Sequence, residues 1–435
     1  MIFTRSALPR GRHLAVTWNI PDDFGGMTST LLRRSRVFVR HGGVEVDVLT
    51  FAVRDDWREV EASLRAKGEL VDGMRLLNVW TWLGGDGRVV EHNDGEGRPL
   101  LVQHYRADGS LAVSDRRDID EEGVVGGRLI TWFDPHGVPL RSWKRSWSLY
   151  RWWLDELTRG QRGFVIVDSK TSANFMLGYR RPNIVVAHVV HNSHLTAAGE
   201  LRPSRRRVLE KLRSFDLVVL LTERQRHDVV GLLGDSGNLR VIPNPHDVRP
   251  TPRARGDHGL VLASLTARKR VDLAVRAAAA AGSHLDVYGD GELRGRLERL
   301  VTELGASGTV RLRGYRPGAR EELAAASLVL LTGSSEGSPL VLVEAMAAGC
   351  IPIAIDVPYG PADLIRDRVN GFLIPSADAT DMAVSIAAAI TELRSLTPSR
   401  RAAMRRAAQR TARQYSDIAA VRRWSRALRG ASKAS

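Results

Sequence analysis

The chain has a single cysteine, Cys350, in 435 residues, so it cannot form an internal disulfide. This cysteine content fits a reducing compartment, and its apolar neighbours predict that Cys350 is a small buried residue. No run approaches the ~18 unbroken apolar residues of a membrane-spanning helix. Arginine and proline interrupt the first ten residues, which argues against a secretory signal. Together these absences predict a cytoplasmic protein.

Lysine is also scarce: nearly all of the basic residues are arginine, and the net charge is +15. Such a charge is typical of proteins that bind nucleic acid, an anionic membrane surface or another polyanion, although arginine content also follows genome composition. No zinc-finger spacing or RNA-recognition signature accompanies the charge, so we disfavour nucleic acid. Another polyanion, or peripheral contact with the anionic inner membrane surface, stays open.

The length and the apolar fraction of 43% predict a globular protein of two domains. The chain opens with a strand over 13–18, a loop that contains Gly25-Gly26, a helix over 28–41 and a strand over 44–50. This order is typical of a parallel α/β sheet, and glycines after a first strand let backbone approach a ligand. We predict a first α/β domain over 1–248.

Residues 78–145 interrupt this pattern with short aromatic and β-branched runs between turn signals. The turn signals are Asp86-Gly87, Asp94-Gly95, Asp108-Gly109 and Asp134-Pro135-His136-Gly137. They predict an antiparallel β-sheet inserted into the first domain. Asp118 and Asp120 within it match a D-x-D metal pattern, but charged residues surround them, so we interpret them as solvated surface.

A helix is predicted over 141–157, with Trp143, Trp147, Tyr150 and Leu154 at helical spacing. Core packing is the favoured interpretation of this spacing. Because arginine and lysine are interleaved with the aromatic residues, an interfacial or subunit-contact helix is the alternative.

The α/β pattern then returns, and a linker over 249–256 separates a second domain over 257–400 from the first. Further strands are expected over 163–168, 183–191, 215–221, 260–263, 285–288, 310–312, 328–331 and 351–355. Helices between these strands predict doubly wound sheets, with ligands at the carboxyl ends of the strands. The final residues, 401–435, are predicted to form an arginine-rich helical tail.

A well-marked helix start lies in the second domain. Ser338 is expected to be the N-cap and Pro339 the first helical residue. The helix is predicted to run from Leu340 to Ala348 and to end at Gly349, which suits a left-handed conformation. Its free backbone N–H groups and the positive end of its dipole favour a bound anion.

Two acids accompany this helix. Glu336 lies in the loop before it, and Glu344 about two turns inside. Together with an anion site, they suit a nucleotide sugar: the helix end binds the diphosphate, one acid binds sugar hydroxyls and the other the ribose. The alternative is a capped core helix with two solvated acids.

Two more segments follow strand ends in the second domain. Arg268 and Lys269 can bind a phosphate, and Gly289-Asp290-Gly291 provides a tight turn. The glycines also resemble a dinucleotide-binding fingerprint. We disfavour a dehydrogenase because the next strand ends in Arg313-Gly314-Tyr315, without an acid for the ribose.

Three histidines, His188, His191 and His194, lie three residues apart in the first domain. A strand that runs into a loop would scatter them, and no cysteine or carboxylate joins them, so we predict no zinc site. We expect one of them on a cleft wall, in contact with sugar or acceptor.

From about Val185 to Pro375 these segments resemble the retaining GT-B glycosyltransferases with an E-x7-E motif (glycosyltransferase family 4, group 1). The matching parts are the Lys269 loop, 288–291, 313–315, 336–349 and 370–372. The inserted block and the segment 356–361 narrow the resemblance to the bacterial poly(glycerol-phosphate) α-glucosyltransferases and to the enzymes that put GlcNAc on serine-rich proteins.

The resemblance implies two Rossmann-like domains that face each other across a cleft, and a homo-oligomer formed through the inserted sheet. It implies retaining transfer of glucose or GlcNAc from a UDP-sugar, without a metal, to a polyol-phosphate polymer such as wall teichoic acid. A serine/threonine or lipid-linked acceptor stays an alternative, as does a catalytically silent glycan-binding partner subunit.

The resemblance also implies roles for residues. Glu336 would bind donor sugar hydroxyls, Glu344 the ribose, and Lys269 with Arg268 the leaving diphosphate, while His191 would line the sugar site. The other donor-binding residues would be Gly289, Asp290, Gly291, Tyr315, Ser338, Pro339 and Leu340, and Gly25 and Gly26 would approach phosphate or acceptor. One position departs from the family, which usually has an arginine five residues before the lysine; here it is Ser264.

Overall fold

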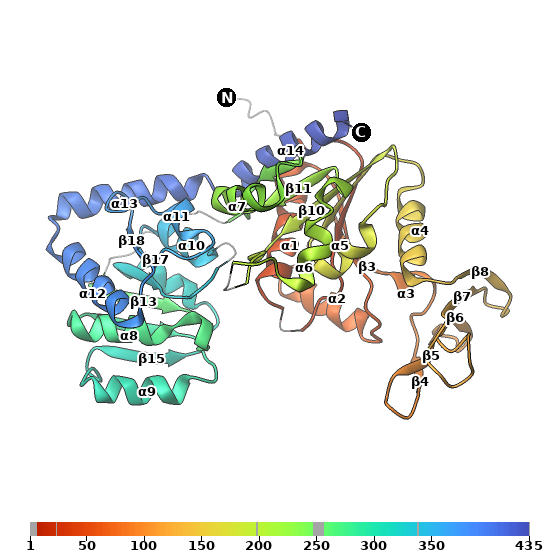
Figure 1. Ribbon diagram of the computed structural model, residues 1–435, viewed down its shortest axis with the longest axis horizontal. Coiled ribbons are helices and arrows are strands. Elements are labelled where there is room, and N and C mark those ends of the chain that lie inside the picture. The colour runs from red at the N-terminus through yellow and green to blue at the C-terminus, as the bar shows by residue number, and fades with distance from the viewer. Residues whose placement is uncertain (1–6, 23, 197–198, 247–255, 337–338, 435) are drawn as a thin grey trace.

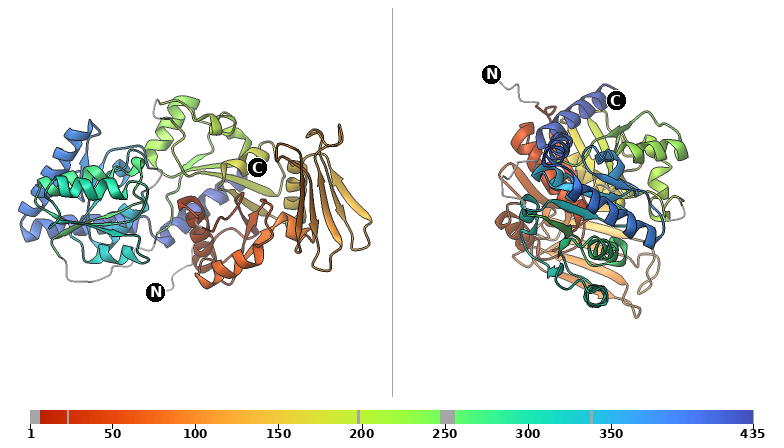
Figure 2. Two further views of the ribbon diagram at one scale, coloured as in Figure 1. Left: turned by 90° about the horizontal axis from the view of Figure 1, so that it is seen from below. Right: turned by 90° about the vertical axis from the view of Figure 1, so that its left-hand side faces the viewer.

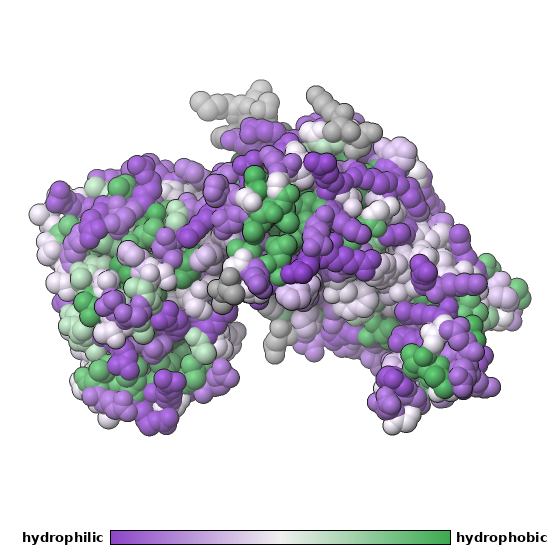
Figure 3. Space-filling view, in the orientation of Figure 1, coloured by the Kyte–Doolittle hydropathy of each residue, from purple (hydrophilic) through white to green (hydrophobic). Residues whose placement is uncertain are grey.

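The computed structural model describes residues 7–22, 24–196, 199–246, 256–336 and 339–434. They form two parallel sheets and one antiparallel sheet (Figure 1). Most of the predicted linker lies outside the described residues. In the part of the chain that is described, no helix is long and apolar enough to cross a membrane. Hydrophilic side chains cover much of the face drawn in Figure 3, beside smaller apolar areas.

The first sheet has seven parallel strands in the order β12-β11-β10-β9-β1-β2-β3. Side chains alternate between its two faces: Val165 and Val167 of β9 join one apolar cluster, and Phe164 and Ile166 join another. Because both faces are covered, β9 and β10 are apolar and buried throughout. The strands are β1 Arg12–Val16, β2 Val46–Thr50, β3 Met74–Asn78, β9 Gly163–Val167, β10 Ile184–Val190, β11 Leu217–Leu220 and β12 Leu239–Val241.

The second sheet has six parallel strands in the order β15-β14-β13-β16-β17-β18. The strands are β13 His258–Leu262, β14 His284–Tyr288, β15 Val310–Gly314, β16 Leu328–Leu331, β17 Ile351–Ile355 and β18 Phe372–Ile374. The two parallel sheets confirm the predicted α/β class. The expected strand list missed β3, β12 and β18, which pair at the edges of their sheets and are only partly buried.

The helices α1–α11 and the short helical turns η1–η4 connect these strands. Their bounds are α1 Gly26–Val37, η1 Phe38–Gly42, α2 Trp57–Ala66, α3 Val79–Trp82, α4 Ser146–Thr158, α5 Lys170–Met176, α6 Pro203–Leu209, η2 Leu212–Ser214, α7 Glu223–Leu233, η3 Ala267–Lys269, α8 Val271–Ala280, α9 Arg294–Glu303, η4 Ala319–Ala324, α10 Leu340–Ala348 and α11 Pro361–Leu364. Helix α12, Ala379–Ser395, packs against α8. Cys350, directly after α10, is fully buried as predicted.

The third sheet is the predicted insertion, and its five antiparallel strands follow one another in sequence order. They are β4 Val89–Asn93, β5 Pro99–Tyr105, β6 Leu111–Arg116, β7 Leu129–Phe133 and β8 Pro139–Trp143. Figure 2 shows this sheet at the end of the molecule away from the second parallel sheet. Val138 and Leu140, next to and within the edge strand β8, are more than half exposed. An oligomer formed through this sheet stays a prediction.

The predicted solvated acids in the insertion differ from one another. Asp118 is largely buried and forms an ion pair with Arg116, with Nε 2.7 Å from Oδ1. It also accepts a hydrogen bond from the backbone N–H of Gly123. Asp120 is exposed. The solvated interpretation is therefore wrong for Asp118, which organises its own loop.

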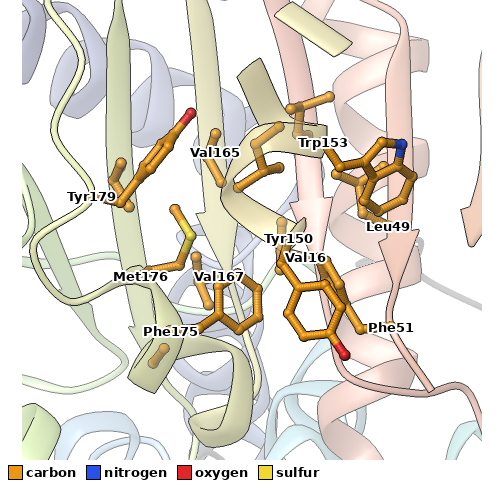
Figure 4. Close-up of a cluster of buried hydrophobic side chains, with 14 of the residues drawn as sticks. Val16, Leu49, Phe51, Tyr150, Trp153, Val165, Val167, Phe175, Met176 and Tyr179 are labelled. Atoms are coloured by element: carbon orange, nitrogen blue, oxygen red, sulfur yellow. The ribbon is translucent and has the colours of Figure 1, made fainter. Parts of the chain in front are cut away.

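The aromatic helix begins at Ser146 rather than Arg141, because Trp143 belongs to β8. Tyr150 and Leu154 are buried as expected, and they pack with Trp153 and Phe51 between α4 and the first sheet (Figure 4). Trp147 is 36% exposed and lies under the Arg207 guanidinium instead of joining the core. The core interpretation is correct for the helix but wrong for Trp147.

The residues expected to form one helical tail are two helices that pack on different domains. Helix α13, Pro398–Arg413, packs on α10 beside the second parallel sheet. Helix α14, Asp417–Ala434, returns to the first domain and lies along it in Figure 1. There Trp424 is buried against Phe38. Apolar residues on one face of each helix cause this packing, which the arginine content of the segment conceals.

Contacts between polar groups connect the two domains beside α7. Arg224 forms an ion pair with Asp356, with Nη1 2.6 Å from Oδ1. The Tyr359 hydroxyl donates a hydrogen bond to Asp228, 2.8 Å away. The 356–359 segment of the second domain is thus held against the first domain, next to the cavity described below.

Candidate active site

A cavity of about 850 Å³ lies between the two domains. Its lining comes from segments after β1, β9, β10, β12, β13 and β16, at the carboxyl ends of parallel strands, where ligands of doubly wound sheets bind. The first domain contributes Asn19, Pro21, Gly25, Gly26, Met27, Thr28, Thr30, Lys170, His191, Asn192, Ser193, Arg202, Ser204, Arg205 and Asn244, and the second contributes Arg268, Lys269, Ser335, Glu336 and Leu340. Seven of the predicted site residues therefore meet in one cavity.

Glu336 and Lys269 form an ion pair in this cavity, with the Lys269 ammonium 2.6 Å from Oε1 of Glu336. Arg268 lies 3.8 Å from the same oxygen and donates a hydrogen bond to the Ser335 carbonyl. The loop that follows β17 holds the Glu336 backbone, since its N–H donates to Pro358 and its carbonyl accepts from Tyr359. A bound anion can therefore compete with Glu336 for Lys269.

A buried ion pair between Arg34 and Asp168, which the sequence analysis did not identify, holds His191 in place. Its Nε2 lies 2.6 Å from Oδ1 of Asp168, and Arg34 donates two hydrogen bonds to the same carboxylate. Burial alone would raise the pKa of Asp168, but the charge of Arg34 and the hydrogen bonds from Arg34 and His191 lower it to about 2. The ionised carboxylate holds the proton of His191 on Nε2 and fixes the ring at the cavity wall.

The other two histidines are core residues. His188 is buried beside the Val167 carbonyl, and burial lowers its pKa to about 4. His194 is buried and stacks on Tyr359, with ring centroids 5.7 Å apart, and burial likewise lowers its pKa to about 4. Within the described ranges, no group of three histidine, cysteine or acidic residues could hold a metal ion. Of the three histidines, His191 lines the cavity.

Glu344 lies inside α10, one turn after Leu340, and is not itself among the residues that line the cavity. Its side chain is 8% exposed, and Oε1 is 2.8 Å from Nη1 of Arg320 and 3.4 Å from Nε2 of His246. Burial raises the pKa of Glu344, and the charges of Arg320 and Arg33 oppose this shift. Its role towards a ribose stays a prediction.

The start of α10 differs from the expectation by one residue. Pro339 has ψ of 85° and precedes the helix, so Leu340, not Pro339, is its first residue. The predicted N-cap, Ser338, lies outside the described residues. Leu340 lines the cavity, and Gly349 ends the helix in the left-handed conformation, with φ of 75°.

Gly289 and Gly291 do not line the cavity but pack against the backbone of the loop after β13, which carries Lys269. A Cβ on Gly289, where φ is 145°, would lie 1.8 Å from the Ala263 carbonyl oxygen, and one on Gly291 would lie 2.6 Å from that of Leu265. The carbonyl of Asp290 also accepts a hydrogen bond from the Leu265 N–H. These residues keep the loop after β14 against the loop that carries Lys269. Tyr315 is 77% exposed and is outside the cavity lining.

We expect Gly289→Ala to lower the free energy of unfolding by about 2–4 kcal/mol, because the methyl group meets backbone and the φ angle disfavours an L side chain. Gly308→Ala is the matched control, since nothing lies within 4 Å of the added Cβ there. Urea denaturation of both variants measures the difference. Equal stability of the two variants would contradict the close approach of these loops.

The site lies on segments that comparison with known proteins connects to glycosyl transfer. Residues 258–411 match the family described as glycosyl transferases group 1. A poly(ribitol-phosphate) alpha-N-acetylglucosaminyltransferase of Staphylococcus aureus (strain COL) is 21% identical over 443 residues, which cover 83% of this chain and 89% of that enzyme. A poly(glycerol-phosphate) alpha-glucosyltransferase of Bacillus subtilis (strain 168) is 22% identical over 302 residues, 66% of this chain and 45% of that enzyme.

A solved structure extends the similarity to nearly the whole chain. The pneumococcal O-GlcNAc transferase GtfA in complex with UDP and GlcNAc superposes with a TM-score of 0.71, at 16% identity, over 97% of this chain and 99% of that one. This likeness concerns the fold, and with the sheet orders above it confirms the predicted GT-B architecture with an inserted sheet. Residues 258–411 therefore match the glycosyl transferases group 1 family, within a chain that has the GT-B fold.

Proposed function

We propose that this protein transfers a hexose, glucose or GlcNAc, from a UDP-sugar to a hydroxyl of a polyol-phosphate polymer such as wall teichoic acid, with retention at the anomeric carbon. One observation carries the proposal: the Glu336–Lys269 pair and His191 meet in one cavity, and the other charged residues of its described lining are cations. The activities named for the Staphylococcus and Bacillus relatives support the acceptor class. The UDP and GlcNAc named in the pneumococcal complex support the donor class.

In this reaction the bond between C1 of the sugar and the diphosphate oxygen breaks, and C1 bonds to the acceptor oxygen. The acceptor proton passes to the leaving diphosphate. Lys269 and Arg268 stabilise the charge that develops on that diphosphate, so we propose that no metal ion is required. Glu336 and His191 bind the sugar hydroxyls, and Glu336 stabilises the reacting face.

The remaining predicted residues keep supporting parts in the proposal. Glu344, oriented by Arg320, binds the ribose of the nucleotide. Gly25 and Gly26 present backbone to acceptor or phosphate, since nothing lies within 4 Å of a Cβ built on either. A small residue there leaves room for a ligand at the cavity wall.

The test is UDP release by the purified protein from UDP-glucose, UDP-GlcNAc and UDP-galactose, each with and without poly(glycerol phosphate) and poly(ribitol phosphate). We expect UDP release from one of the donors. Its rate should rise sharply when one of the polymers is added and should not fall in the presence of EDTA. The anomeric configuration of the product, read by NMR, tests retention. UDP release that does not change when either polymer is added would favour a protein or lipid acceptor. No UDP release with any donor would favour the silent partner subunit.

A further inference from the structure

The wall of the cavity that belongs to the first domain carries three cations without acidic partners. Lys170 begins α5, and Arg202 and Arg205 lie just before and within α6. Among the residues that the structure describes, no carboxylate forms an ion pair with any of them, whereas Glu336, the acid in the described lining, pairs with Lys269 of its own domain on the other side of the cavity. An excess of positive charge therefore remains on this wall.

Of the three cations, Arg205 is the one whose charge is most unfavourable without a bound anion. It is mostly buried, and this burial, together with the charge of Arg202, lowers its pKa. Burial is the main cause of the lowered pKa values of His188 and His194, and the charge of Arg205 adds to both shifts, as expected for a guanidinium near these histidines. Because a buried charge without a partner is unfavourable, the arrangement points to an anion that binds from the cavity.

The cations are held on one wall by the fold. Helix α5 packs against α6, and the N–H of Arg202 donates a hydrogen bond to the His194 carbonyl, 2.9 Å away. The loop that carries His191, Asn192 and Ser193 therefore lies beside both arginines. An anion on this wall would sit next to the histidine side of the cavity, on the domain opposite Lys269 and Arg268.

We propose that Lys170, Arg202 and Arg205 bind a phosphodiester group of the acceptor polymer, and so hold the neighbouring polyol unit at the reacting end of the cavity. The inference rests on the proposed function. A planar guanidinium binds two phosphate oxygens at once, which suits the repeating phosphodiester of such a polymer. We assign the subsite to acceptor rather than donor because the second domain supplies its own cations, Arg268 and Lys269, for the diphosphate.

The experiment compares Arg205→Gln with Arg206→Gln. Arg206 is the next residue of the same helix, is exposed and lies outside the cavity lining, so both changes remove one positive charge from α6. For Arg205→Gln we expect kcat/KM for poly(glycerol phosphate) to fall about 10- to 100-fold, the loss expected when hydrogen bonds between charged groups are removed. Its affinity for UDP stays unchanged, and Arg206→Gln behaves like the unchanged protein.

Direct binding separates this inference from the proposed function. Calorimetric titration with short glycerol-phosphate oligomers needs no turnover, so binding that Arg205→Gln weakens supports the subsite even if no sugar is transferred. Arg205→Lys, which keeps the charge, should recover part of the affinity, and thermal melting checks that each variant is folded. The proposed subsite is wrong if the wild-type protein binds no oligomer, or if Arg206→Gln lowers the affinity for the oligomer as much as Arg205→Gln does. It is also wrong if Arg205→Gln lowers the affinity for UDP as much as the affinity for the oligomer.

Discussion

Replacing Glu336 by glutamine lowers kcat by about 10²- to 10³-fold, the range found when one group that stabilises a transition state is removed. Glutamine keeps the shape of the side chain and one acceptor oxygen but removes the charge that pairs with Lys269 at 2.6 Å. The affinity for UDP should hold or rise, because Lys269 is then free for the diphosphate. A fall in kcat without a loss of UDP affinity is a result that simple misfolding does not produce.

The matched control for this experiment is Glu303→Gln. Glu303 ends α9, is exposed and lies outside the cavity lining, so its loss removes the same charge without touching the site. Steady-state UDP release with saturating polymer gives kcat, and calorimetry gives the affinity for UDP. If both variants turn over at the wild-type rate, Glu336 has no role in the reaction.

Asp168→Asn should destabilise the protein by about 3–5 kcal/mol, because it leaves the Arg34 guanidinium buried beside a neutral group. The double variant Arg34→Met, Asp168→Asn should recover most of this loss, since no uncompensated charge then remains and the new amide oxygen can still accept a hydrogen bond from His191. Denaturant unfolding of the wild type and both variants measures the three free energies.

The surface pair Glu61–Arg65 provides the control, because both side chains are more than one-third exposed. Glu61→Gln should change the free energy of unfolding by no more than about 1 kcal/mol. If Asp168→Asn costs no more than Glu61→Gln, or if adding Arg34→Met makes the loss larger, the buried pair is not what determines stability here.

The same pair predicts a dependence on pH. The pKa of Asp168 is lowered to about 2 in the folded protein, against about 3.9 in the unfolded chain. Because the folded value is the lower one, the ionised carboxylate contributes fully to stability above about pH 4, and this contribution is lost as the pH falls through 2. We expect the free energy of unfolding, measured from pH 5 to pH 2.5, to decrease less in the double variant Arg34→Met, Asp168→Asn than in the wild type.

The sequence predicted the parts of the site that depend on neighbours along the chain. The helix over Leu340–Ala348, its end at Gly349 and the position of Lys269 after a strand are all set by local spacing. These signals need no knowledge of the partner domain. The two domains and the inserted sheet followed from the same reasoning, because strand and turn patterns repeat along each of them.

The parts that were missed depend on contacts between distant segments. Arg34 and Asp168 are 134 residues apart, and an arginine in an amphipathic helix gives no sign that it is buried. The one available signal was the position of Asp168 directly after a buried strand, at the edge of the sheet where ligands bind. The prediction for Trp147 was wrong because its helical spacing fits the core. In the structure its ring lies outside the core, under the guanidinium of Arg207 from another helix.

The return of α14 to the first domain has a mechanical consequence. The chain passes between the domains twice, and the two passages touch where the N–H of His246 donates to the Tyr415 carbonyl, 2.9 Å away, and His246 pairs with Ser416. Two connections that meet at one place restrain sliding and twisting of one domain against the other more than a single linker would, and the contacts of Arg224 and Tyr359 add to this restraint.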